Sequence, residues 1–268
     1  MSKPRNGAII TLGNNKGGTG KTSICCTVAA SLALKGHKVL VIDADAQANT
    51  TANLYGQSKP DASLYDIFRH RDEKDIEVTM EELVQPTSYD NLSIIPTVQA
   101  LALCESRHFQ TVPHSYKRMK NVMQTFCREN FDFTFVDTSP ALGYWLINAL
   151  MMSTGCIIPV EAGSQFAIDG LFNLVAFVQK VAEKNTDLDE IKIAINMADG
   201  RTSASKSCVQ FLQDRFSDFC FKTIIPRSTA VEQAQIYRET VLRHAGTTPA
   251  AKRFRALAEE IKREMSRK

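Results

Sequence analysis

The chain of 268 residues has few of the features that mark secreted, zinc-binding or disordered proteins. Its seven cysteines form no C-x-x-C pair and are too sparse for a disulfide scaffold, so we expect free thiols in a reducing compartment. The five histidines are scattered and give no zinc-type spacing. Residues 1–6 lack the apolar core of a secretory signal. A hydrophobic content of 44% with 23% charged residues excludes wholesale disorder.

A membrane-spanning run is also missing. Residues 141–160 carry no charge and are long enough to cross a bilayer, but Asn148, residues 153–155 and Pro159 interrupt them. A buried helix, a turn and a core strand explain this stretch better. We therefore expect no membrane span.

The net charge of +3 is small, but it is unevenly distributed. Residues 238–268 carry nine Lys/Arg against four Asp/Glu, a balance of +5, which leaves −2 for the first 237 residues. A basic terminal segment favours a polyanionic partner, either nucleic acid or an anionic membrane. A solvated helix face is the simpler explanation of the same charges.

Short apolar runs alternate with longer amphipathic ones along almost the whole chain. The pattern predicts strands at residues 8–12, 38–42, 92–95, 133–136, 156–160, 191–195 and 221–225. It predicts helices at residues 21–35, 115–129, 143–152, 168–183, 204–216, 230–237 and 249–265. Continuous apolar strands separated by helices indicate an α/β fold, with a mostly parallel twisted sheet of about seven to eight strands covered on both faces.

We expect residues 1–268 to form a single domain. The most polar stretch, residues 57–90, is interpreted as a helical and loop insertion within it, and residues 249–268 as a C-terminal helix. Ser63 and Asp66 fit a helix-capping box with Asp in place of Glu.

The strongest functional signal is a glycine-rich segment at residues 13–22, between the first strand and the first helix. Four of the thirteen glycines fall within eight positions there. Glycines let backbone N–H groups converge on phosphates, and the helix N-terminus adds partial positive charge. Lys21 would then reach the β- and γ-phosphates of a nucleotide, and the Thr22 hydroxyl would bind Mg²⁺. Asn15 stands where the usual P-loop pattern begins with glycine.

Carboxylates follow two later strands. Asp43 and Asp45 come at the end of one apolar strand, and Asp137 ends another. Strand carboxyl ends carry the ligand in folds of this kind, and an Asp ending an apolar strand is the Walker B arrangement near Mg²⁺. Without the glycine-rich loop, an aspartate capping a strand end would be the simpler explanation.

Together these segments resemble the ParA/MinD group of P-loop ATPases. The segment from Lys16 to Thr22, K-G-G-T-G-K-T, matches the deviant Walker A motif of that group. The resemblance implies a P-loop NTPase fold that binds ATP and Mg²⁺, and an ATP-sandwich homodimer in which Lys16 reaches the partner's nucleotide. Residues 43–47 resemble the D-x-D-P-Q motif, with Ala46 in place of proline. Residues 137–140 resemble D-T/C-P-P, with Ser139 in place of the first proline.

Later segments extend the resemblance over nearly the whole chain, from about residue 7 to the C-terminal helix. Residues 157–160 and 169–171 resemble I-I-P-V…E-G-L, residues 196–202 resemble N/T-M-x-D-x-R-T, and residues 223–227 resemble T-x-I-P-R. No helix-turn-helix segment precedes the P-loop, which favours the compact ParA type found in chromosomal and small plasmid systems.

The resemblance assigns roles to residues. It makes Lys16, Lys21 and Asp45 catalytic, and it gives Thr22, Asp43 and Asp137 to the metal. The nucleotide-binding candidates are Asn15, Lys16, Gly17, Gly18, Thr19, Gly20, Lys21, Thr22 and Ser23, with Asn196, Met197, Pro226 and Arg227 beside the adenine.

A ParA-type protein binds DNA without sequence preference, and a ParB-like partner stimulates its hydrolysis of ATP. We therefore expect a cytoplasmic, nucleoid-associated partition ATPase. The candidate DNA contacts are Arg201, Arg227, Arg238, Arg243, Lys252, Arg253 and Arg255.

Three alternatives remain. A MinD-like membrane switch needs an exposed apolar face on its last helix, where the tail offers only Ile261 and Met265. A ParA-like ATPase could position a protein cargo instead of DNA. A metabolic P-loop enzyme fits less well, because an iron–sulfur type needs a cysteine shortly after Asp137 and a ligase needs no Lys16.

Overall fold

One sheet organises the part of the chain described by the computed structural model, which is residues 6–56, 58–105, 112, 114–163 and 165–266, without the side chains of residues 165–169. Its strands follow the order β3-β4-β2-β5-β1-β6-β7, and all neighbours are parallel except β3 and β4. The strand bounds are β1 Ala8–Leu12, β2 Val39–Ala44, β3 Gln85–Pro86, β4 Leu92–Ile95, β5 Phe133–Thr138, β6 Gly155–Glu161 and β7 Glu190–Asn196.

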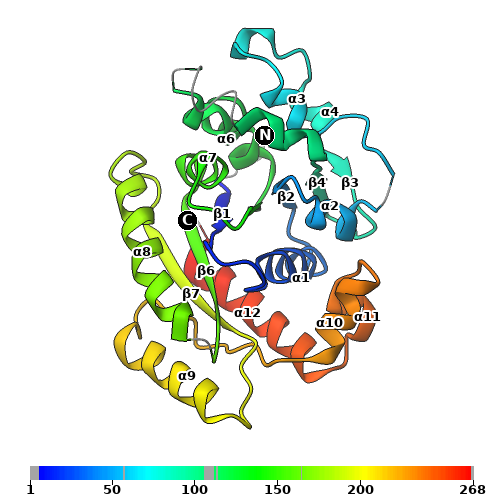
Figure 1. Ribbon diagram of the computed structural model, residues 1–268. Coiled ribbons are helices and arrows are strands. Elements are labelled where there is room, and N and C mark those ends of the chain that lie inside the picture. The colour runs from blue at the N-terminus through cyan, green and yellow to red at the C-terminus, as the bar shows by residue number, and fades with distance from the viewer. Residues whose placement is uncertain (1–5, 57, 106–111, 113, 164, 267–268) are drawn as a thin grey trace.

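Helices cover both faces of this sheet (Figure 1). The α-helices are α1 Lys21–Ala33, α2 Asn49–Leu54, α3 Leu64–Phe68, α4 Met80–Leu83, α6 Arg118–Asn130, α7 Tyr144–Met152, α8 Gln165–Ala182, α9 Ser203–Arg215, α10 Thr229–Ile236, α11 Val241–Ala245 and α12 Pro249–Met265. Three short 3-10 turns are η1 Glu73–Asp75, η2 Gln99–Leu101 and η3 Ser115–Lys117. The predicted α/β architecture is confirmed.

The strands are buried on both faces, as their unbroken apolar sequences predicted. In β2, Val39 and Val41 pack into the cluster that contains α1 and α12. Leu40 and Ile42 point the other way, into the cluster that contains α3, α6 and α7. Successive side chains of a strand face opposite sides, so a strand that is apolar at every position is stable only between two helical layers.

The strand expected at residues 221–225 is wrong. This segment runs beside β7, where the N–H groups of Phe221 and Ile225 donate to the carbonyls of Ile193 and Ile195 at 3.0 Å. No continuous ladder forms among these described residues, only isolated bridges of Ile193 with Cys220 and of Ala198 with Pro226. The buried carboxylate of Glu260 on α12 accepts hydrogen bonds from the N–H groups of Lys222 at 2.6 Å and Thr223 at 2.9 Å. These donors are therefore taken by a side chain instead of a strand ladder.

The polar stretch at residues 58–90 holds the short helices α3 and α4, and the last helix, α12, ends at Met265. The interpretation of this stretch as an insertion stays a prediction. Ser63 and Asp66 form the expected capping box at the start of α3. The antiparallel β3, which was not predicted, adds a short edge strand to the sheet. The predicted end of the last helix, residues 267–268, lies outside the described residues. The assignment of the chain to a single domain stays a prediction.

All seven cysteines are buried and free. Burial raises the pKa of the Cys127 and Cys156 thiols to about 12. This agrees with the expectation of unbridged thiols, and it gives them a role in packing.

Candidate active site

The glycine-rich loop connects the end of β1 to the start of α1. Gly20 is the residue before the helix, with φ +88°, and a Cβ on it would lie only 2.2 Å from Nδ2 of Asn196. Glycine is therefore needed both for the left-handed backbone and for the close approach of another strand end. The loop turns directly into the N-terminus of α1, which is the end that favours phosphate.

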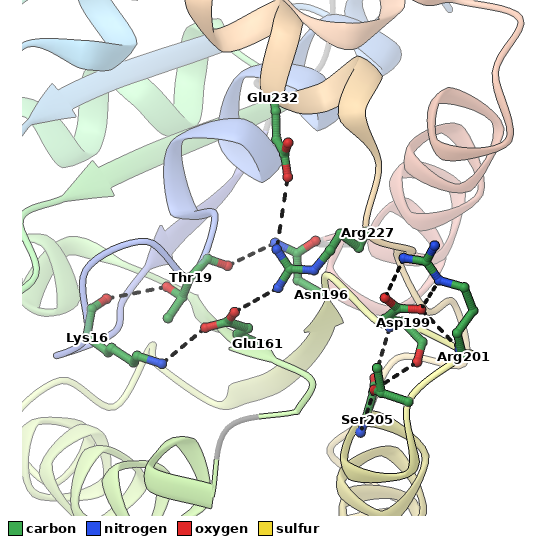
Figure 2. Close-up of polar contacts among 10 residues, drawn as sticks. Lys16, Thr19, Glu161, Asn196, Asp199, Arg201, Ser205, Arg227 and Glu232 are labelled. Atoms are coloured by element: carbon green, nitrogen blue, oxygen red, sulfur yellow. Dashed lines mark hydrogen bonds and ion pairs between the residues drawn. The ribbon is translucent and has the colours of Figure 1, made fainter.

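Two asparagines, one in the loop and one at the end of β7, hold this loop against the neighbouring strands. Asn14 donates to the carbonyl of Pro159 at 2.6 Å and accepts from the N–H of Lys16 at 2.9 Å. Asn196, which is 3% exposed, donates to the carbonyl of Thr19 at 2.9 Å (Figure 2). The structure thus places Asn196 behind the loop. Asn14 was missed, because its partner Pro159 lies 145 residues away.

Asp137 lies next to the first turn of α1. Its Oδ2 accepts hydrogen bonds from the hydroxyls of Thr22 at 2.6 Å and Thr50 at 2.7 Å. Its Oδ1 is buried and has no hydrogen-bond partner among the described residues. A buried carboxylate oxygen without a partner is costly unless a ligand completes it. Thr22, Thr50 and Asp137 offer the hard oxygen donors that Mg²⁺ prefers, so this donor set fits the expected metal.

Asp43 is the register partner of Asp137 in the neighbouring strand. Its Oδ2 accepts from the N–H of Thr51 at 2.8 Å and the hydroxyl of Thr51 at 2.7 Å, and its Oδ1 accepts from the N–H of Asp45 at 3.2 Å. Burial, together with the nearby Asp137, raises the pKa of Asp43 to about 7. Asp43 therefore holds the turn into α2. Its metal role stays a prediction.

Asp45 and Lys21 line the same cavity. Oδ1 of Asp45 accepts from the N–H of Gln47 at 3.0 Å, which fixes the turn that carries its carboxylate. Burial lowers the pKa of Lys21, although the charges of Asp137 and Asp45 partly offset this. The structure thus brings the predicted catalytic residue Lys21 close to the carboxylates of Asp45 and Asp137.

Lys16 is paired within its own chain. Its Nζ lies 3.1 Å from Oε2 of Glu161 at the end of β6, and Oε1 of Glu161 accepts from Nη2 of Arg227 at 2.9 Å (Figure 2). These two cations lower the pKa of Glu161 despite its partial burial. Glu161 was not predicted, although its position directly after the segment 157–160 was a signal for it. Arg227 lies in this ion-pair cluster with Lys16.

The cavity beside the loop has a volume of about 960 Å³. It is lined by residues 17–23 of the loop and α1, by parts of residues 45–60 and 97–99, and by Met197, Gln235 and Arg238. Of the predicted adenine-side residues, Met197 lies on this lining. Pro226 is joined to Ala198 by a bridge beside β7. Adenine contact by these residues stays a prediction.

The candidate DNA residues have different surroundings. Arg201 forms a two-bond pair with Asp199, at 2.9 Å and 2.8 Å (Figure 2). Arg243 lies 4.6 Å from the ring centre of Tyr89, and Arg255 donates to a main-chain carbonyl at 2.6 Å. Two further candidates, Lys252 and Arg253, are exposed on α12. Their contact with DNA stays a prediction. The side chain of Asp169, in the E-G-L-like segment, lies outside the described residues.

Within the described ranges, no helix combines the length and the apolarity needed to cross a bilayer. The expectation that the chain has no membrane-spanning helix is confirmed for this part of the protein. The apolar residues of α12, including Ile261 and Met265, are buried against the cluster around α1.

Known proteins resemble this chain over almost its full length. The AAA domain family matches residues 7–191. The chain is 31% identical over 258 residues to the sporulation initiation inhibitor protein Soj of Bacillus subtilis (95% of this chain, 98% of the relative). It is also 31% identical over 255 residues to the chromosome-partitioning ATPase Soj of Thermus thermophilus (94% of each).

Solved structures share the fold. A putative plasmid partition protein from Borrelia burgdorferi, bound to AMPPNP, has a TM-score of 0.79 at 24% identity and covers 98% of this chain and 100% of its own. A cobyrinic acid a,c-diamide synthase from Mycobacterium smegmatis, bound to an ATP analogue and magnesium, has a TM-score of 0.77 at 21% identity, with 94% and 93% covered. At such identities, the likeness concerns the fold alone.

The loop geometry and the sequence relatives together define the class. The chain belongs to the ParA/MinD type of P-loop ATPases. Within this class it is a ParA-like ATPase, because its relatives at 31% identity are Soj proteins that it matches over at least 94% of either chain.

Proposed function

We propose that this ParA-like ATPase segregates a plasmid or chromosome by cycling between ATP-bound and ATP-free states. It binds ATP and Mg²⁺, forms an ATP-dependent homodimer, binds double-stranded DNA without sequence preference, and hydrolyses ATP when a ParB-like partner stimulates it. It acts in the cytoplasm, on the nucleoid. The observation that carries the proposal is the buried Oδ1 of Asp137, which lacks a partner among the described residues beside Thr22 and the glycine-rich loop.

The chemistry follows from the side chains around the cavity. Thr22 and Asp137 would hold Mg²⁺, which offsets phosphate charge when it is bound. Lys21 offsets the charge of the β- and γ-phosphates, and Asp45 orients a water for attack on the γ-phosphorus. The new bond forms to the water oxygen as the bond to the bridging oxygen breaks, which leaves ADP and phosphate.

Dimerisation is proposed to change the partner of Lys16. In the single chain its ammonium group is paired with Glu161 and its side chain is 40% exposed, so the ion pair can be exchanged at small cost. In the dimer we expect it to bind the nucleotide of the second subunit. This makes nucleotide and dimer mutually dependent, as a switch requires.

DNA binding is proposed to depend on basic residues outside the loop. Lys252 and Arg253 are exposed on α12, and Arg201 is 87% exposed in spite of its pair with Asp199. Contacts of this kind act on phosphates, so binding should weaken steeply with salt. Positioning of a protein cargo would use the same ATPase cycle with another partner. The burial of the apolar face of α12 speaks against a MinD-like membrane anchor.

The decisive experiment measures binding to nonspecific double-stranded DNA with ATP, with ADP and without nucleotide, at two salt concentrations. We expect tight, salt-sensitive binding with ATP alone. Lys16→Ala should abolish DNA binding and keep ATP binding. Lys184→Ala, at an exposed position after α8, is the matched control and should change neither. If wild-type protein binds DNA in no nucleotide state, the DNA-segregation proposal fails.

A further inference from the structure

Arg238 follows α10 in a backbone conformation that arginine rarely adopts. Its φ is +54°, in the left-handed region. The N–H of Glu239 donates to the carbonyl of Ala234 at 2.9 Å, and the N–H of Arg238 donates to that of Gln235 at 3.1 Å. These two bonds form a Schellman motif, in which the left-handed residue is usually glycine. The fold alone would be served better by glycine here, so the arginine side chain calls for another explanation.

Other strained positions lie around the same cavity. The described residues include five non-glycine residues at positive φ, and three of them, Ala48, Met197 and Arg238, line the cavity beside the P-loop. Strain of this kind concentrates at ligand-binding sites, where surrounding contacts maintain it. The strained backbone of Arg238 therefore favours a role for its side chain in binding a ligand in this cavity.

The last turn of α10 is tied to the phosphate end of the cavity. Nε2 of Gln235 donates to Oγ of Ser23, the residue after Thr22 in the first turn of α1. Arg238 stands three residues beyond Gln235 and lines the same space. The position of its turn is thus fixed by a contact with the helix that carries the phosphate-binding N-terminus.

The charges around the cavity suit a polyanion. Among the described lining residues, Lys21, Lys59 and Arg238 are basic and Asp45 is acidic. Within the described part of the chain, the guanidinium of Arg238 has no hydrogen-bond or ion-pair partner. Arg255, by contrast, donates to the carbonyl of Gly246. Arg238 is therefore available to a ligand that enters the cavity.

We propose that Arg238 is a nucleotide-binding residue, whose guanidinium holds the phosphate chain of a bound nucleoside triphosphate from the α10 side of the cavity. This rests on the proposed ATPase function and deepens it. It also replaces the DNA contact predicted for Arg238 from sequence. A charge-assisted hydrogen bond of this kind raises affinity by about tenfold.

The test compares Arg238→Gly, Arg238→Asn and Arg238→Lys with a matched control, Arg215→Asn, at an exposed arginine that ends α9. Glycine and asparagine tolerate the left-handed backbone, so the fold is retained and the charge is lost. ATP binding with Mg²⁺ is measured by calorimetry, thermal unfolding without nucleotide, and DNA binding separately. We expect about tenfold weaker ATP binding for Gly and Asn, with an unchanged or higher Tm. Lysine should retain most of the affinity, and Arg215→Asn should bind as wild type.

The outcomes separate this inference from the function it rests on. If wild-type protein binds and hydrolyses ATP and both Arg238→Gly and Arg238→Asn bind ATP equally well, the assignment of Arg238 is wrong and the ATPase proposal stands. If those variants lose DNA affinity alone, Arg238 belongs to the DNA surface and the inference is overturned. If the wild-type protein binds no ATP, both proposals fall together.

Discussion

The ends of β2 and β5 lie side by side, and each carries a fully buried aspartate at the same register position. Both carboxylate oxygens of Asp43, at the end of β2, accept hydrogen bonds from the segment that follows directly, at Asp45 and Thr51. Asp137 at the end of β5 uses one oxygen for Thr22 and Thr50 and keeps the other without a described partner. Equal burial thus accompanies two different hydrogen-bonding arrangements.

The difference arises from the residues that come after each strand. After Asp43 the chain turns at once and brings Thr51 back to the carboxylate. After Asp137 the next hydroxyl, that of Thr138, donates away to the carbonyl of Leu12 at 2.8 Å. A carboxylate satisfied by its own turn stabilises the fold, and one left incomplete is available for a ligand.

Asp137→Asn should give the largest effect. It removes the negative charge beside the P-loop, so Mg²⁺-dependent hydrolysis should fall by about 100-fold or more. Stability should be kept, because the buried charge is removed and the amide oxygen can still accept from the hydroxyls of Thr22 and Thr50. Phosphate release and urea unfolding check the two expectations. If the variant loses both activity and stability, Asp137 holds the fold together as Asp43 does, and the contrast between them fails.

Asp43→Asn should change how stability depends on pH. Its folded pKa, about 7, lies above the ordinary value of 3.8, so the folded state holds more protons between these values. The wild-type protein should therefore lose stability as pH rises from about 4 to about 7, by an amount on the order of 4 kcal/mol that asparagine removes. Urea unfolding of magnesium-free protein across this range measures it. Parallel wild-type and variant profiles would contradict the expectation.

Thr50→Val and Thr51→Val form a matched pair that separates the two carboxylates. The Thr51 hydroxyl donates to Asp43 and accepts from the N–H of Thr97 at 2.9 Å, so its loss should cost about 1.5 kcal/mol of stability. The Thr50 hydroxyl donates to Oδ2 of Asp137, so its loss should weaken Mg²⁺-dependent ATP binding by about tenfold. It should cost less stability than the loss of the Thr51 hydroxyl, because Thr22 still donates to the same oxygen. Calorimetry and urea unfolding of both variants decide. If the two variants change ATP binding and stability by the same amounts, the proposed difference between Asp43 and Asp137 is wrong.

Glu161→Gln should give the smallest effect. It loosens Lys16 and Arg227 at a partly exposed position, so stability should change by less than about 1 kcal/mol. ATP-dependent dimerisation should be slightly favoured, because Lys16 no longer has to leave a carboxylate. Sedimentation with ATP against nucleotide concentration measures this. Weaker dimerisation in the variant would mean that Glu161 assists the assembled state.

Local pattern was sufficient for much of this site. Six of the seven strands, the loop and the three aspartates follow from apolar runs, glycine spacing and the residues that end each strand. Long-range partners were beyond its reach. Glu260 accepts a hydrogen bond from the N–H of Thr223, 37 residues away in the sequence, and this donor is then not available to a strand ladder. Asn14 and Glu161 act through partners about 145 residues distant. Arg238 was predicted as a DNA contact from its charge, and that prediction stays untested; its position on the cavity lining could not be read from local pattern.

The burial of all seven cysteines has a practical consequence. Thiol reagents attack accessible thiolates, and burial both hides these sulfurs and raises the pKa of those in β6 and α6. A single cysteine introduced at an exposed site such as Lys184 would therefore be the fast-reacting thiol of an otherwise native chain. A dye placed there can report the proposed ATP-dependent dimerisation in real time, with every native residue of the core left unchanged.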